Sequence, residues 1–176
     1  MLKPLVVASS LIIVSGCDNN LTAQQTEHVV KPAQLSAFEQ YSHQANNLLN
    51  NIRAKKDAAS LEAESAELVT LSQALLKELI VKYPQCTEYL DALSEVATVL
   101  SSLPIDEIES GYHSDGKLPK FDEPICYHAK DLLVHPATVQ ANARLGLVEQ
   151  HAYQNAELDI IEVIAHLEQL DRALNN

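Results

Sequence analysis

The sequence predicts an all-α fold: an antiparallel bundle of about four main helices with one long disulfide-stapled connection. Alanine and leucine dominate the chain, whereas it has only four glycines and no tryptophan, a balance that favours helix. Apolar residues recur every three or four positions over most of the chain, and no stretch alternates convincingly with a period of two. Two cysteines, Cys86 and Cys126, provide the expected disulfide.

The N-terminus has the pattern of an export signal. Lys3 precedes an apolar run from Leu5 to Val14, which is too short for a comfortable membrane span and ends in small residues. The sequence Val14-Ser15-Gly16-Cys17 resembles the lipobox of bacterial lipoproteins. This resemblance implies that residues 1–16 are a signal peptide and that Cys17 becomes the diacylated first residue of the mature chain.

Residues 17–31 are expected to form the lipidated N-terminus and a flexible tether, because they are polar and lack periodicity. Asp18-Asn19 resembles the inner-membrane retention signal of enteric lipoproteins. The resemblance therefore places the protein in a bacterial cell envelope, facing the periplasm, with the inner membrane favoured slightly over the outer. The membrane is an expected partner through the lipid.

The remaining residues, 32–176, suit one domain with an adequate core. Once Lys3 has left with the signal, eleven basic and 24 acidic residues give the mature chain a net charge of −13. A charge of this sign argues against binding to nucleic acid and against lying flat on anionic lipid.

The first two helices are predicted at about 32–56 and from Asp57 or Ser60 to Tyr83. Both candidate start residues of the second helix are good N-caps, and Pro84 stops it. Stripes of apolar residues at helical spacing mark the buried faces: Phe38, Tyr41, Ala45, Leu48, Leu49 and Ile52 in the first helix, and Leu61, Leu68, Leu71, Leu75 and Leu79 in the second.

A third helix is predicted from about Thr87 to a point before Pro104, and residues 104–136 form the long connection. Helical pattern resumes within it at Pro124, a natural first-turn residue, and Pro136 is expected to break or kink that helix. From 137 to 174, Gly146 leaves two alternatives open, one long bent helix or two helices.

The cysteine count predicts a disulfide. If Cys17 carries lipid, Cys86 and Cys126 remain, and an even pair in an oxidising compartment usually forms a bridge. No Cys-x-x-Cys spacing supports the alternative, a redox-active or metal-binding pair.

A metal site is the sharpest chemical hypothesis. His113, His128 and His135 lie within 23 residues, and His128 and Asp131 are three apart, so both could reach one ion on a helix. Imidazole and carboxylate together suit zinc, copper or iron. The alternative is an acidic, solvated loop whose histidines bind backbone groups. His166 lies on a mostly polar register and is expected at the surface.

Three aromatic residues of the connection, Tyr112, Phe121 and Tyr127, are candidates for a surface that binds an unknown protein or small ligand. No nucleophile-elbow, phosphate-loop or covalent-haem motif is present, so no catalytic residues are predicted. The sequence thus favours a lipid-anchored protein with a non-catalytic binding or envelope-structural role, and the alternative is a periplasmic metal-binding protein that uses the 104–136 segment.

Overall fold

The computed structural model describes residues 35–113, 117–120, 123–148 and 150–175. The expected signal peptide, Cys17, the tether and Phe121 lie outside these ranges.

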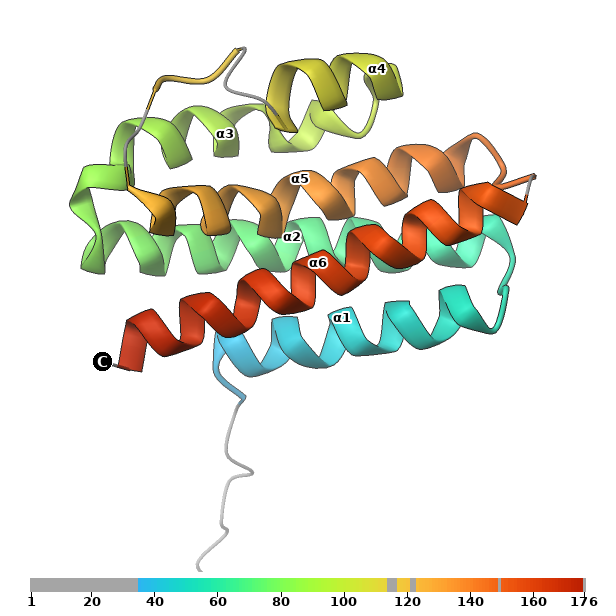
Figure 1. Ribbon diagram of the computed structural model, residues 1–176, viewed down its shortest axis with the longest axis horizontal. Helices are drawn as coiled ribbons and strands as arrows, with labels where there is room; N and C mark the ends of the chain where they lie inside the picture. Colours follow the sequence, from blue (N-terminus) through green and yellow to red (C-terminus); the bar gives the residue numbers. More distant parts are fainter. Residues whose placement is uncertain (1–34, 114–116, 121–122, 149, 176) are drawn as a thin grey trace, which may run out of the picture. The chain divides into compact units, whose positions relative to one another are not determined.

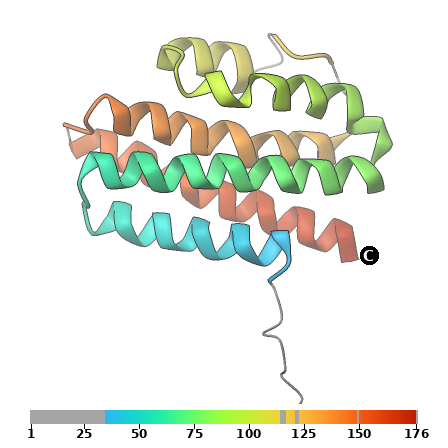
Figure 2. The ribbon, with the colours of Figure 1, turned by 180° about the vertical axis from the view of Figure 1, so that it is seen from behind.

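The described part of the chain is all-α, as predicted, and contains no strand. Four long helices form a closed bundle in which each contacts two neighbours in the order α1, α2, α5, α6 (Figure 1). The shorter α3 and α4 form an additional layer over α2 and α5, and Figure 2 shows this layer from behind. The helices are α1 (Ala37–Arg53), α2 (Ala58–Lys82), α3 (Thr87–Leu100), α4 (Ile105–Ile108), α5 (Pro124–Arg144) and α6 (Gln150–Asn175).

Side-chain caps fix the starts of the first two helices. Ser36 Oγ accepts a hydrogen bond from the Glu39 amide at 3.2 Å, and the Glu39 carboxylate accepts one from the Ser36 amide at 2.8 Å. This capping box starts α1 at Ala37, later than the expected Pro32. Asp57 caps α2 by accepting a hydrogen bond from the Ser60 amide at 3.0 Å, which confirms the first of the two predicted starts.

Helix α5 is the central element of the domain. It contacts α2, α3, α4 and α6, so it is buried on almost every side over 129–139, and its mixed polar and apolar sequence has no single apolar face. The expected break at Pro136 is wrong, because α5 continues through the proline to Arg144. The hydroxyl of Tyr41 in α1 donates a hydrogen bond to the Leu132 carbonyl, which faces the proline one turn later.

Residues 137–174 belong to two helices and not to one long bent helix. Helix α5 ends at Arg144, and Gly146 has a φ of +106°, a left-handed conformation that glycine adopts without steric cost. The chain then reverses, and α6 runs antiparallel to α5 (Figure 1). This reversal brings the second half of α6 alongside the first half of α5.

The predicted disulfide is confirmed. Cys86 ends a short 3-10 turn (Pro84–Cys86) before α3, and it is bonded to Cys126 in the first turn of α5. The bridge therefore ties the end of the connection between α3 and α5 to the start of α3. The connection carries α4 and a π-helical turn (Glu109–His113), and it ends at Pro124, where helix was expected to resume.

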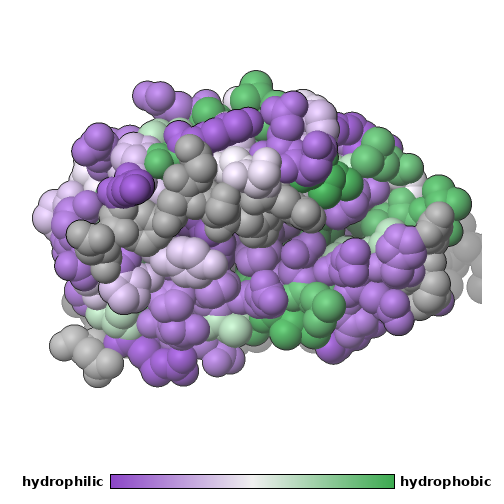
Figure 3. All heavy atoms as spheres, turned by 45° about the horizontal axis from the view of Figure 1, so that its top comes forward, coloured by the Kyte–Doolittle hydropathy of each residue, from purple (hydrophilic) through white to green (hydrophobic). Residues whose placement is uncertain are grey.

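The face of the molecule shown in Figure 3 is mostly hydrophilic. Figure 3 shows one face on which polar side chains predominate and hydrophobic ones gather in small patches, largely toward one end. No described helix is both long enough and apolar enough to cross a membrane.

Candidate functional site: a histidine–carboxylate cluster between two helices

Six titratable side chains meet where α5 and α6 run side by side. They repeat at the same spacing on both helices, three and then four residues apart, so the antiparallel arrangement pairs them in reverse order. The set, called the α5–α6 cluster below, is His128, Asp131 and His135 from α5 and Asp159, Glu162 and His166 from α6.

The contacts follow this reverse pairing. At one end, His128 Nδ1 lies 2.8 Å from His166 Nδ1. At the other end, His135 Nδ1 lies 3.1 Å from Asp159 Oδ1. Between them, the His166 and His135 rings stack with their centroids 6.1 Å apart. The cluster is thus a continuous row of polar groups inside a bundle whose other interhelical contacts are mainly apolar.

Asp131 is the centre of the cluster. Its Oδ2 lies 3.3 Å from His166 Nε2, and its Oδ1 lies 3.8 Å from His135 Nε2. The residue is only 1% exposed. One donor atom from each of Asp131, His135 and His166 falls within 4.8 Å of the other two, which is the spacing expected of ligands to one ion.

Glu162 adds a fourth candidate ligand atom, an oxygen, from the solvent side. Its Oε2 lies 3.3 Å from His135 Nε2, and its side chain is 58% exposed. Ligand atoms that share a tetrahedral zinc ion lie about 3.3 Å apart, because each is about 2.1 Å from the metal. Two of the contacts between ligand candidates, His166 to Asp131 and His135 to Glu162, match this separation.

Burial affects the charge of two of the imidazoles. It lowers the pKa of His128 and of His166, because the buried rings lose hydration of their charged form. The Asp131 carboxylate opposes this effect in both cases without overcoming it. These rings are therefore neutral at pH 7, which is the state that binds metal ions.

Two depressions in the surface adjoin the cluster. One, of about 300 Å³, is lined by Asp159 and Glu162 together with other residues of α5 and α6 and with Ile105 of α4. The other, of about 480 Å³, includes His128 and lies at the opposite end of the cluster. An ion in solution therefore has an approach through exposed Glu162.

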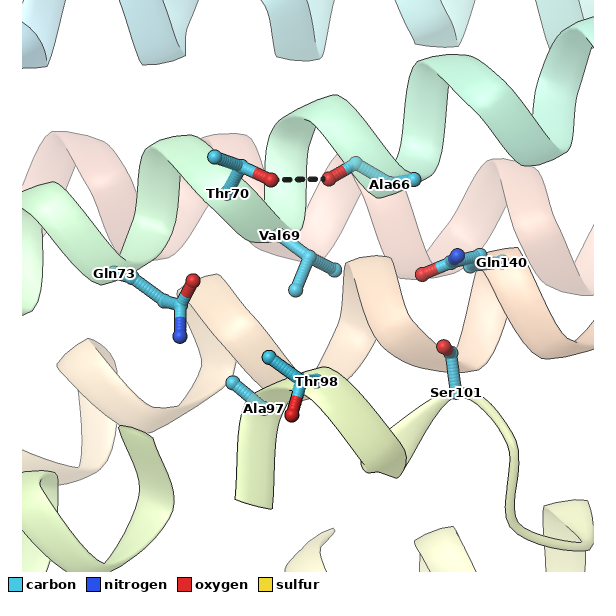
Figure 4. A pocket seen from close by; sticks show the side chains of 8 residues that line it. All are labelled: Ala66, Val69, Thr70, Gln73, Ala97, Thr98, Ser101 and Gln140. Carbon is cyan, nitrogen blue, oxygen red and sulfur yellow. Dashed lines mark hydrogen bonds between the residues drawn. The ribbon is translucent and has the colours of Figure 1, made fainter. Parts of the chain in front are cut away.

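A separate cavity lies away from the cluster. It has a volume of about 210 Å³ and is lined by residues of α2, α3 and α5 together with Ser101, as Figure 4 shows. Its lining side chains are apolar or uncharged, and within it the Thr70 hydroxyl donates a hydrogen bond to the Ala66 carbonyl. This cavity holds no titratable group that could support acid–base or metal chemistry.

The structure brings only some of the predicted site residues together. His128, Asp131 and His135 come together, although His128 reaches the other two through His166. Nothing is described of the His113 side chain, so its place as a ligand stays untested. Of the aromatic residues predicted to form a partner surface, Tyr112 is buried, with 7% exposure, whereas Tyr127 is 41% exposed. The Tyr127 ring lies edge-on to the rings of His128 and His166.

The sequence reasoning missed half of the cluster. His166 was expected at the surface, but its side chain is only 16% exposed and contacts Asp131. Asp159 and Glu162 were not considered. The missed signal is the repeated spacing, because 128, 131 and 135 on one helix and 159, 162 and 166 on an antiparallel neighbour pair in reverse order.

Comparison with protein families, with curated proteins and with solved structures returned no match for this chain. The chemistry of the α5–α6 cluster is therefore the main indication of function.

Proposed function

We propose that this protein binds a divalent transition-metal ion between α5 and α6. The observation that carries the proposal is the convergence of Asp131, His135 and His166 on one buried position, with donor atoms within 4.8 Å of one another. Glu162 completes a set of four ligands from the solvent side. This function is the alternative that the sequence offers to a non-catalytic binding or envelope-structural role.

The hydrogen bonds around the cluster support the same assignment. Metal-binding histidines usually donate their second N–H to a carboxylate or another acceptor, which fixes the ring and its tautomer. His135 presents Nε2 to Asp131 and Glu162 while its Nδ1 faces Asp159. His166 repeats the arrangement, with Nε2 toward Asp131 and Nδ1 toward His128. Both rings can therefore carry their proton on Nδ1 and leave Nε2 free for a metal.

The donor set narrows the choice of metal. Two imidazoles with one or two carboxylates suit zinc, copper(II) and iron(II), whereas calcium and magnesium prefer oxygen ligands alone. Zinc is the first ion to test, because it has no redox chemistry that would complicate the measurement.

The decisive experiment measures zinc binding to the mature chain, purified without a histidine tag, by competition with a chromophoric chelator. We expect one zinc ion per chain, and we expect His166→Ala to weaken binding at least about tenfold through loss of a direct ligand. The matched control is His151→Ala, which removes an exposed histidine from the same helix. Failure of zinc, copper and iron to bind stoichiometrically would refute the proposal, as would unchanged zinc binding in His166→Ala.

We further propose that the metal site faces the periplasm of a bacterium on a lipid anchor at Cys17. The support is the sequence Val14-Ser15-Gly16-Cys17 and the polar stretch that follows it. If Cys17→Ser leaves the protein in the membrane fraction as before, the anchor is excluded.

A further inference from the structure

Lys130 is the most unusual charged residue of the described chain. It lies in α5, it is fully buried at 0% exposure, and it is the immediate neighbour of Asp131. Lysine is almost never fully buried without a partner, because removing an ammonium group from water is costly. The contacts of Lys130 therefore indicate why the charge is kept there.

The ammonium group of Lys130 lies against the proposed metal site. Its Nζ is 3.1 Å from Asp131 Oδ1, and it sits 4.0 Å from the centroid of the Tyr127 ring. A carboxylate and an aromatic face both stabilise a cation. The chain thus supplies a positive charge of its own to the carboxylate at the centre of the α5–α6 cluster.

We propose that Lys130 is a built-in competitor for the metal ion, so that the site binds its metal reversibly. This inference rests on the proposed function. A metal bound to Asp131 Oδ1 would lie at most about 5 Å from the ammonium group if Lys130 kept its position, because Nζ is 3.1 Å from that oxygen and metal–oxygen bonds are about 2.1 Å long. Two positive charges this close repel each other strongly in a protein interior. Metal binding therefore requires the ammonium to move away from Asp131 or to tolerate that repulsion.

The competing explanation is that Lys130 only neutralises Asp131 for the sake of folding. The two explanations predict opposite effects on affinity. A competitor lowers the metal affinity, so its removal makes binding tighter. A purely structural partner holds Asp131 in place, so its removal leaves the affinity unchanged or weakens it.

The test is the zinc affinity of Lys130→Met in the full mature chain. Methionine keeps the apolar stem and removes the charge, and we expect binding at least about tenfold tighter than in the wild type. The matched control is Lys117→Met, which removes an exposed lysine paired with Glu107 on the surface and should leave the affinity unchanged. Equal or weaker zinc binding by Lys130→Met would overturn the inference.

A second variant separates charge from packing. Lys130→Arg keeps the positive charge, so its zinc affinity should stay far below that of Lys130→Met even if both changes loosen the fold. If Lys130→Arg binds zinc as tightly as Lys130→Met, the charge is not the cause and the inference fails.

The failure of this inference can be told apart from the failure of the proposed function. Zinc binding by the wild type without tightening in Lys130→Met would refute only the competition. Zinc binding by Lys130→Met alone would refute metal binding by the natural chain and, with it, the reversible binding inferred here. Absence of binding in both would refute both.

Discussion

At the scale of single residues, the interior of α5 shows how a proline is accommodated in a helix. Pro136 has no amide hydrogen, so the carbonyl of Leu132, one turn earlier, loses its helical donor. The hydroxyl of Tyr41 in α1 donates a hydrogen bond to that same carbonyl at 2.5 Å. Burial raises the pKa of Tyr41 well above its ordinary value, so the hydroxyl remains a donor over the accessible pH range.

Replacement of Tyr41 by phenylalanine tests this explanation. The change leaves the buried Leu132 carbonyl without its donor, and we expect the free energy of unfolding to fall by about 1–3 kcal/mol. Urea denaturation followed by circular dichroism measures the loss.

The matched background is Pro136→Ala, whose alanine amide can bond to Leu132 directly. In that background, Tyr41→Phe should lower the free energy of unfolding by clearly less than it does in the wild type. An equal cost in both would show that the hydroxyl does not compensate for the proline.

The imidazoles of the α5–α6 cluster also predict how stability depends on pH. Burial lowers the folded-state pKa of His128 and His166, and for His166 the nearby His128, His135 and Lys130 lower it further, whereas Asp131 raises it. Below the ordinary pKa of histidine, about 6.5, these two histidines therefore bind protons in the unfolded chain more readily than in the folded chain.

We therefore expect the metal-free protein to lose stability as the pH falls from 7 through 6.5 toward the lowered folded-state values. Thermal unfolding in the presence of a chelator, at pH 7.5 and at pH 5.5, measures the effect. Carboxylates titrate mainly below this pH range and contribute little to the change in stability within it. The stability of the double variant His128→Gln with His166→Gln should therefore depend less on pH than that of the wild type. A wild type as stable at pH 5.5 as at pH 7.5 would contradict the prediction.

At the scale of elements, the disulfide fixes the start of α5 against the chain that precedes α3. It closes a loop with a sequence separation of 40 residues, which includes α3, α4 and the connection. Closure of a loop of this length reduces the entropy of the unfolded chain, and the stabilisation is about 4 kcal/mol in the chain-entropy model.

The double replacement of Cys86 and Cys126 by alanine should therefore lower the free energy of unfolding by up to about 4 kcal/mol. Both residues are buried, so part of the loss arises from the cavities that their sulfur atoms leave. Reduction of the wild type, compared with reduction of the variant, separates the two contributions. If dithiothreitol leaves the stability of the wild type unchanged, the bridge contributes nothing.

At the scale of the whole molecule, the sequence predicts what depends on local signals. The Asp57 cap, the stop at Pro84 and the apolar stripes of α1 and α2 are visible along the chain, and they place these helices. The disulfide follows from counting cysteines.

Features that depend on distant partners were beyond the sequence. The continuity of α5 requires a hydroxyl 91 residues away, and no pattern around Pro136 indicates it. The burial of Lys130 and His166 depends on the packing of α5 against its neighbours, because both residue types are usually exposed. The metal hypothesis therefore named the cluster residues on α5 and missed their counterparts on α6.

The central position of α5 has a consequence for the dynamics of the molecule. A helix in contact with four others opens locally less readily than one at the surface, so we expect its amide hydrogens to exchange slowly with solvent. Three of the six cluster residues stand on this enclosed helix, whereas their partners stand on α6, one face of which remains in contact with water. We therefore expect the cluster to open through movement of α6, and the proposed metal ion would enter and leave at a rate set by that helix.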